Sequence, residues 1–105
     1  MEIYHAKFGV GQLIVHKLFN YRGIVFDVEP VFQGSDEWYV KVALSCPPKD
    51  EPWYKVLVHN AFHETYVAER NLVPDRTSDP INHPLIEDFF ERCRDGSYIL
   101  TQRIN

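Results

Sequence analysis

Two histidines four residues apart, His59 and His63, are the residues whose type and spacing most resemble a chemical site. His63 precedes Glu64, which gives the first half of the His-Glu-x-x-His signature of zinc proteases. The fourth residue after His63 is Val67, so the signature is incomplete. The flanking residues alternate and are β-branched, which predicts a β-hairpin, and no third ligand is evident nearby. We therefore expect no metal site and interpret both histidines as solvated residues of a hairpin turn.

Other residue patterns that could support catalysis are equally incomplete. Asp27 and Glu29 share one face of a predicted strand, as catalytic carboxylates can, but exposed strand faces carry such pairs routinely. Cys46 and Cys93 form no Cys-x-x-Cys and are interpreted as reduced thiols. No glycine-rich phosphate loop precedes a helix. We expect a protein that is not an enzyme, with no catalytic residues and no cofactor.

The elements that must position any binding residues are mostly short strands. Strands are predicted over residues 12–16, 23–29, 52–59, 64–69 and 71–74. Within the second of these, Ile24, Phe26 and Val28 are expected to share one face. Five short strands in about 65 residues predict a small, partly open antiparallel β-barrel over about residues 6–74.

Residues 35–46 are open to two interpretations. Ser35 followed by Asp36 and Glu37 resembles a helix N-terminus, with a capping hydroxyl and acids that suit the helix dipole. An alternating strand fits nearly as well. We expect a short helix here, ended by Pro47 and the proline that follows it.

A C-terminal helix is predicted from Pro84 onward, so that helix and tail occupy about residues 82–105. Its apolar stripe has helical spacing and comprises Leu85, Ile86, Phe89 and Phe90. Arg92 and Arg94 suit its last turn, and Gly96 suits a C-cap. The tail, residues 97–105, is compatible with either a docked strand or an extension of the helix.

Composition and charge narrow the class of protein. The chain has 105 residues, is 45% hydrophobic and carries a net charge of −4, which predicts one domain over residues 1–105 with a real core. Residues 1–26 contain three Lys or Arg against one acidic residue, so only this part could offer a basic patch. No apolar run approaches the roughly 20 residues of a membrane span, and the first residues lack a signal-peptide pattern. We expect a cytoplasmic protein that binds no membrane.

Four blocks of the sequence, in order, resemble one known family. The blocks are KFGVGQ (7–12), YRGIVFDVEP (21–30), PWYKVLV (52–58) and TYVAExNL (65–72). Together they resemble the YccV-like, hemimethylated DNA-binding family, which is also known by its heat-shock member HspQ. The likeness covers roughly residues 6–90, and His83-Pro84 with the apolar stripe after it is similar to members of this family as well.

The resemblance implies a fold and a function that composition does not. The fold would be a small SH3-like β-barrel. The protein would be a cytoplasmic stress-response factor that forms homo-oligomers and is not an enzyme. It would influence the degradation of selected or denatured proteins, including the replication initiator, by the Lon protease. A preference for hemimethylated DNA is also implied.

These two activities point to two sets of residues. The candidate DNA contacts are the cations and nearby rings Lys7, His16, Lys17, Tyr21 and Arg22. The candidate surface for a protein partner comprises Pro52, Trp53, Tyr98, Ile99 and Leu100, with the tail as the contact for the protease. Phosphate binding needs several cations on one face, and this acidic chain has few. We therefore expect mainly a regulator of Lon-type proteolysis, with DNA binding as the alternative, either weak or dependent on oligomerisation.

Overall fold

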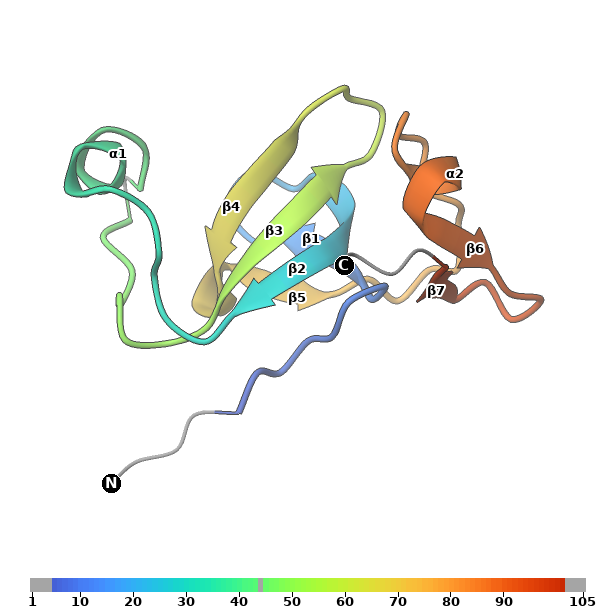
Figure 1. Cartoon of the computed structure of the whole chain (residues 1–105), viewed down its shortest axis with the longest axis horizontal. Coiled ribbons are helices and arrows are strands. Elements are labelled where there is room, and N and C mark those ends of the chain that lie inside the picture. Colours follow the sequence, from blue (N-terminus) through green and yellow to red (C-terminus); the bar gives the residue numbers. More distant parts are fainter. Residues whose placement is uncertain (1–4, 44, 102–105) are drawn as a thin grey trace.

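The computed structural model describes residues 5–43 and 45–101, and its main element is a five-stranded antiparallel sheet (Figure 1). Its strands are β1 (Leu13–His16), β2 (Arg22–Glu29), β3 (Trp53–Val58), β4 (Glu64–Ala68) and β5 (Leu72–Pro74). A short 3-10 helix, η1 (Glu69–Asn71), joins the last two. The order in the sheet is β4-β3-β2-β1-β5, so β4 and β5 are its edges. The predicted mainly β fold is confirmed.

The sheet curls around one apolar core. Buried side chains from all five strands meet in a single cluster, among them Ile14, Val25, Val56, Val67 and Leu72. Because both edge strands contribute to the same cluster, the sheet must be strongly curved. No ladder joins β4 to β5 within the described residues, so the barrel is partly open, as predicted. One edge of β4 is therefore left without a neighbouring strand in this part of the chain.

A β-bulge in β2 changes which side chains of this strand share a face. The pairing of β2 with β3 shifts between Val25 and Asp27, which leaves Phe26 as an extra residue. A bulge adds one residue to a strand and reverses the alternation beyond it. The expectation that Ile24, Phe26 and Val28 share one face is therefore wrong. Val28 packs with Val25 in the first cluster, whereas Ile24 and Phe26 face a second cluster on the other side.

The C-terminal residues cover that other side of the sheet. The buried members of the second cluster are Ile24, Leu57, Ile81, Phe90 and Tyr98. The predicted helix is present as α2, but it has a single turn, Ile86–Phe89. Its predicted continuation to Arg94 with a cap at Gly96 is wrong, because Phe90 begins a strand instead.

That strand, β6 (Phe90–Arg92), pairs with β7 (Tyr98–Leu100) to form a second, two-stranded sheet. Pairing lets the rings of Phe90 and Tyr98 pack edge to face, with centroids 6.3 Å apart, over the main sheet. Gly96, at φ +89°, lies in the connecting turn rather than at a helix end. The strand alternative for the tail thus holds for Tyr98–Leu100, and residues 102–105 lie outside the described residues.

The helical interpretation of residues 35–46 is confirmed by α1 (Asp36–Val42). Ser35 Oγ accepts a hydrogen bond from the Trp38 backbone N–H at 3.1 Å, as an N-cap should. In Figure 1, α1 lies at one end of the main sheet, and the C-terminal unit, formed by α2, β6 and β7, lies at the opposite end. Neither α1 nor α2, the α-helices of the described residues, is long and apolar enough to cross a membrane.

Candidate functional site

Arg22, a candidate DNA contact, is held in an ion pair. Its Nε donates to Asp75 Oδ2 at 2.7 Å, and its Nη2 donates to the Asp79 carbonyl at 2.7 Å. Burial raises the pKa of the Asp75 carboxyl, but hydrogen bonds from Thr77 and Arg22 outweigh it and hold that pKa below its ordinary value. The pair is therefore ionised at neutral pH. The Arg22 guanidinium anchors the segment after β5 and retains few donors for a phosphate.

His16 and Tyr21 are also engaged within the chain. His16 Nδ1 accepts hydrogen bonds from the backbone N–H of Leu18 at 3.1 Å and of Phe19 at 3.2 Å, which closes the β1–β2 turn. Burial lowers the pKa of the His16 imidazole, so the ring is neutral at pH 7. The hydroxyl oxygens of Tyr21 and Thr65 are 2.7 Å apart. Neither His16 nor Tyr21 supplies positive charge for phosphate.

Lys7 and Lys17 are the candidate DNA-binding cations with exposed side chains. The structure brings both to η1. The Lys7 backbone N–H donates to Glu69 Oε1 at 2.7 Å, and the Lys17 backbone N–H donates to the Asn71 carbonyl at 2.8 Å. The residue between these two acceptors is Arg70, which is also exposed. A small basic group, Lys7, Lys17 and Arg70, therefore lies at η1, although Arg70 Nη2 already donates to the Ser45 carbonyl at 2.6 Å.

The candidate partner-contact residues divide into buried and exposed members. Trp53 is 1% exposed, and Pro52 and Tyr98 are buried with it. These three side chains pack in the interior and leave little surface for a protein partner to contact. Ile99 and Leu100, on β7, are 50% and 45% exposed. They form the accessible part of the candidate surface.

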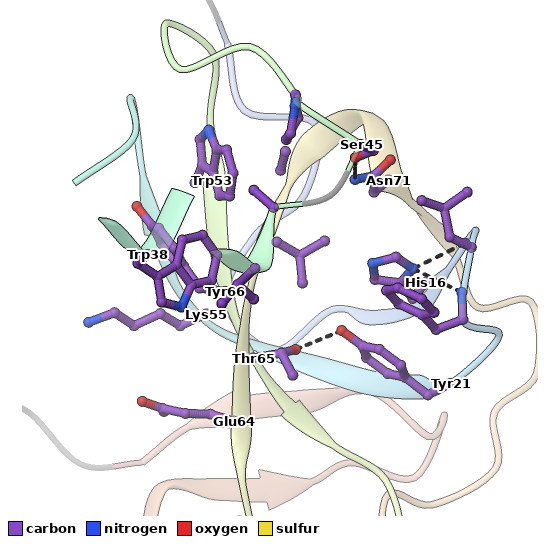
Figure 2. Close-up of a pocket in the computed structure, with 17 residues that line it drawn as sticks. His16, Tyr21, Trp38, Ser45, Trp53, Lys55, Glu64, Thr65, Tyr66 and Asn71 are labelled. Atoms are coloured by element: carbon purple, nitrogen blue, oxygen red, sulfur yellow. Dashed lines mark hydrogen bonds between the residues drawn. The ribbon is translucent and has the colours of Figure 1, made fainter. Parts of the chain in front are cut away.

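A hollow lies along the free edge of β4 (Figure 2). Its volume is about 370 Å³, within the range of ligand pockets. One wall is made by Trp38 and Val42 of α1 together with Tyr66, and the other by Leu18 and Phe19 of the β1–β2 turn. In Figure 2, Trp38 and Tyr66 stand on one side of the hollow, whereas His16 and Tyr21 stand on the other. Because residues from both faces of β4 line it, the hollow wraps around the edge of that strand.

The aromatic wall of the hollow is part of a larger cluster. Trp38 packs against Trp53 and Tyr66, with ring centroids 6.1 and 5.6 Å away, and Phe32 contacts all three rings. The Tyr39 hydroxyl donates to the carbonyl of a buried proline at 2.6 Å, so α1 is fixed to the loop that follows it. The wall is therefore built from side chains whose positions are set by packing.

The hollow is close to electrically neutral. Its charged lining residues are Lys55 and Glu64, one of each sign, and His16 is uncharged at pH 7. Burial raises the pKa of both tyrosine hydroxyls in the lining, Tyr21 and Tyr66, so both stay protonated. A phosphate backbone needs several cations. The lining suits apolar, uncharged groups instead.

The sequence pattern indicated three of the lining residues, His16, Tyr21 and Trp53, as candidate contacts, but it did not indicate those of α1 and β4 beside them. Trp38 and Tyr66 were visible as aromatic residues in a helix and a strand, but they could as well have filled a core. What makes them a wall is the position of β4 at the edge of the sheet. Strand order is a long-range property, and no local signal in residues 64–69 reveals it.

His59 and His63 lie at the β3–β4 turn, as predicted, and their side chains do not act together. His59 Nδ1 accepts a hydrogen bond from the Asn82 backbone N–H at 2.8 Å, and the His63 side chain is exposed. Across residues 5–43 and 45–101, no group of three or more His, Cys, Asp or Glu side chains is arranged to hold a metal ion. Cys46 and Cys93 are free thiols.

Comparison with known protein families gives a match over most of the chain. Residues 6–97 match a family model described as "Hemimethylated DNA-binding protein YccV like". The matched segment contains all five strands of the main sheet, both α-helices and β6, and it ends just before β7. The match therefore spans the hollow, the basic group at η1 and most of the C-terminal unit.

Proposed function

This chain belongs to the YccV-like family of hemimethylated DNA-binding proteins, and from that premise we propose that it is a non-enzymatic, cytoplasmic stress-response factor acting mainly through protein contacts. In this role it directs selected or denatured proteins, among them the replication initiator, to a Lon-type protease. It presents a folded surface to the protease and changes which substrates are degraded.

One observation carries the proposal. The C-terminal hairpin displays Ile99 and Leu100 on a strand whose first residue, Tyr98, is anchored in the second cluster. The Tyr98 hydroxyl also accepts a hydrogen bond from the Ile81 backbone N–H at 3.0 Å. Because the backbone of this strand is already ordered, a partner that covers the two side chains does not have to order the chain that carries them. They are therefore well suited to a protein contact.

The test is degradation reconstituted from purified components. A Lon-type protease digests a denatured model protein with and without this chain, and the double variant Ile99→Ser, Leu100→Ser should lose most of the effect. The control is Val31→Ser, which removes an exposed apolar side chain from the β2–α1 connection. Deleting residues 98–105 is a poorer test, because it also removes the buried Tyr98 ring. Equal activity of both variants would exclude the hairpin as the protease contact.

A second function, binding of hemimethylated DNA, is favoured by the family match and by the basic group at η1. The three cations there are few for tight phosphate binding, so we propose that affinity comes from several subunits of a homo-oligomer. Sedimentation at varied protein concentration tests the oligomer. Gel shifts with unmethylated, hemimethylated and fully methylated duplexes test the preference.

The matched DNA-binding variant is Lys7→Ala, Lys17→Ala, because Arg22 is part of an internal ion pair. If both lysines contact phosphate, the salt dependence of binding should fall by a slope of about 0.9 for each lost contact. Lys41→Ala removes an exposed cation of α1 and should leave the gel shift unchanged. A double lysine variant that binds like the wild type would remove η1 from the DNA-binding model.

A further inference from the structure

We propose that the hollow along β4 is a strand-addition site that holds an extended, apolar polypeptide segment of a denatured client protein. The inference deepens the proposed function by naming what the protein would hold while a protease is engaged elsewhere. Only the role of this binding in protein degradation rests on the proposed function, because peptide binding itself needs no protease.

The backbone of β4 presents the groups that a further strand requires. The Glu69 backbone N–H donates to the Pro52 carbonyl at 3.1 Å, and the register between β3 and β4 is regular from there to the hairpin turn. Antiparallel ladders alternate, so every second residue of β4 points its N–H and C=O away from β3. By this alternation the outward residues are Glu64, Tyr66 and Ala68. In the described chain, no hydrogen bond uses the N–H or C=O of Glu64 or Tyr66, or the N–H of Ala68, on that side.

The two walls supply contacts for alternate side chains of an added strand. Successive residues of a strand point to opposite faces of the sheet. One set would contact Trp38 and Val42 on the α1 side, and the other would contact Leu18 and Phe19 on the turn side. β4 has five residues, which corresponds to about 16 Å of extended chain, so the ligand must be at least this long.

The two walls of the hollow carry exposed apolar side chains that a bound segment would cover. Leu18, Phe19 and Val42 all line the hollow and are all more than half exposed. Apolar side chains gathered at one site mark an interaction surface. Because the lining has one cation and one anion, Lys55 and Glu64, a polyanion gains little there. An uncharged peptide backbone with apolar side chains matches both the charge of the hollow and the outward N–H and C=O groups.

The first experiment measures binding of a fluorescent nine-residue peptide that alternates valine with threonine and ends in glutamine. We expect saturable binding to the purified chain, and no binding of the same peptide with proline at its centre. Two further peptides carry N-methyl groups on alternate amides, in opposite phase. Only amides that face β4 matter in strand addition, so one methylated peptide should bind and the other should not. Equal binding of both would overturn the proposal.

Amide hydrogen exchange locates the peptide. Saturating peptide should slow exchange at Tyr66 and Ala68, whose N–H groups point outward. Thr65 and Val67 are internal controls, because their N–H groups already pair with β3 and should change little. Slowing confined to other segments would place the peptide elsewhere and overturn the assignment.

Matched variants test the two walls separately. Val42→Glu puts a carboxylate into the lining and should weaken peptide binding at least about tenfold, since that charge would be buried unpaired. Val40→Glu makes the same change on α1 at a residue outside the lining, and it should bind like the wild type. On the other wall, Phe19→Ser should weaken binding, whereas Phe62→Ser, at the exposed β3–β4 turn, should not. Thermal unfolding verifies that every variant is folded.

The outcomes separate this inference from the proposed function and from self-association. If both wall variants bind the peptide as tightly as the wild type does, the site is elsewhere. If the peptide does not bind, but Val42→Glu abolishes a concentration-dependent dimer, the edge pairs with a second copy and the client role is refuted. If the peptide does not bind, the strand-addition site is refuted. The degradation assay with Ile99→Ser, Leu100→Ser still tests the proposed function independently.

Discussion

Arg22 Nε and Asp75 Oδ2 lie 2.7 Å apart and tie the first residue of β2 to the residue that follows β5. These two residues are 53 positions apart in the sequence. The pair fixes the end of the last barrel strand against the second, so the path of the chain into the C-terminal unit depends on it. An arginine that the sequence offers as a nucleic-acid contact is therefore a structural residue.

Asp75→Asn should lower the free energy of unfolding by about 1.5–3 kcal/mol, the range for hydrogen bonds to charged groups. The variant keeps the size of the side chain but loses the charge that Arg22 faces. Urea denaturation at pH 7 measures the change, and Asp50→Asn, at an exposed residue, is the control. Equal midpoints for the two variants would mean that the pair contributes nothing.

The Asp75 contribution should also depend on pH. The carboxyl pKa is lower in the folded protein than its ordinary value of 3.8, so the stabilisation is present above that value. It is lost as the pH falls through the lower, folded pKa. The difference in stability between wild type and Asp75→Asn should therefore be constant from pH 7 to 5 and shrink only in strong acid. A difference that already vanishes at pH 5 would contradict a depressed pKa.

The buried His16 ring predicts a second pH dependence, nearer neutrality. Its pKa in the folded protein is lowered from 6.5, so the unfolded chain binds the proton more readily and stability falls as the pH drops below that value. His16→Asn keeps an acceptor for the two turn N–H groups and cannot titrate in this range. Its melting temperature should change less between pH 7.5 and 5.5 than that of the wild type. Phe62→Ser, which changes an exposed residue without removing a titratable group, should retain the wild-type slope.

Gly11 tests the contact between the N-terminal turn and β7. Its φ is +92°, and a Cβ there would collide with the Tyr98 carbonyl. Gly11→Ala should therefore cost about 1–3 kcal/mol, the range for a strained backbone. For a domain of this size the melting temperature should fall by about 4–8 °C for each kcal/mol. Gly9→Ala, where nothing lies within 4 Å of the added methyl, should leave it unchanged.

The N-cap of α1 links helix stability to the hollow. Ser35→Ala removes the acceptor for the Trp38 N–H and should cost about 1 kcal/mol, whereas Ser35→Asp should retain the cap. Exchange of the Trp38 and Tyr39 amides should be faster in the alanine variant alone. If the client peptide binds against this helix, its affinity should fall in Ser35→Ala and recover in Ser35→Asp.

Local patterns predicted the elements whose partners are near in sequence. The hairpin from Trp53 to Ala68 follows from alternation on both sides of a short turn, and its side chains alternate in the structure, with Tyr54 and Val56 in one cluster and Leu57 in the other. The N-cap of α1 was similarly visible in Ser35 and the acids after it. In each case the deciding contacts lie within a few residues.

The features that could not be predicted depend on distant contacts. Phe90 leaves the helical stripe because Tyr98 and the main sheet offer it a better packed position. The bulge at Phe26 is set by pairing with β3, and the free edge of β4 is set by the order of the whole sheet. Alternation and spacing describe one segment at a time, so they could suggest binding residues but not how those residues come together.

The second cluster also determines which contacts resist a force applied at the carboxyl end of the chain. Phe90 and Tyr98 fasten the C-terminal hairpin to Ile24 and Leu57, which belong to strands with neighbours on both sides. An unfolding machine that pulls on the carboxyl end would have to break these interior attachments before any edge strand peels away. A load applied at that end is therefore shared by β2 and β3, two interior strands, before it reaches either edge of the main sheet.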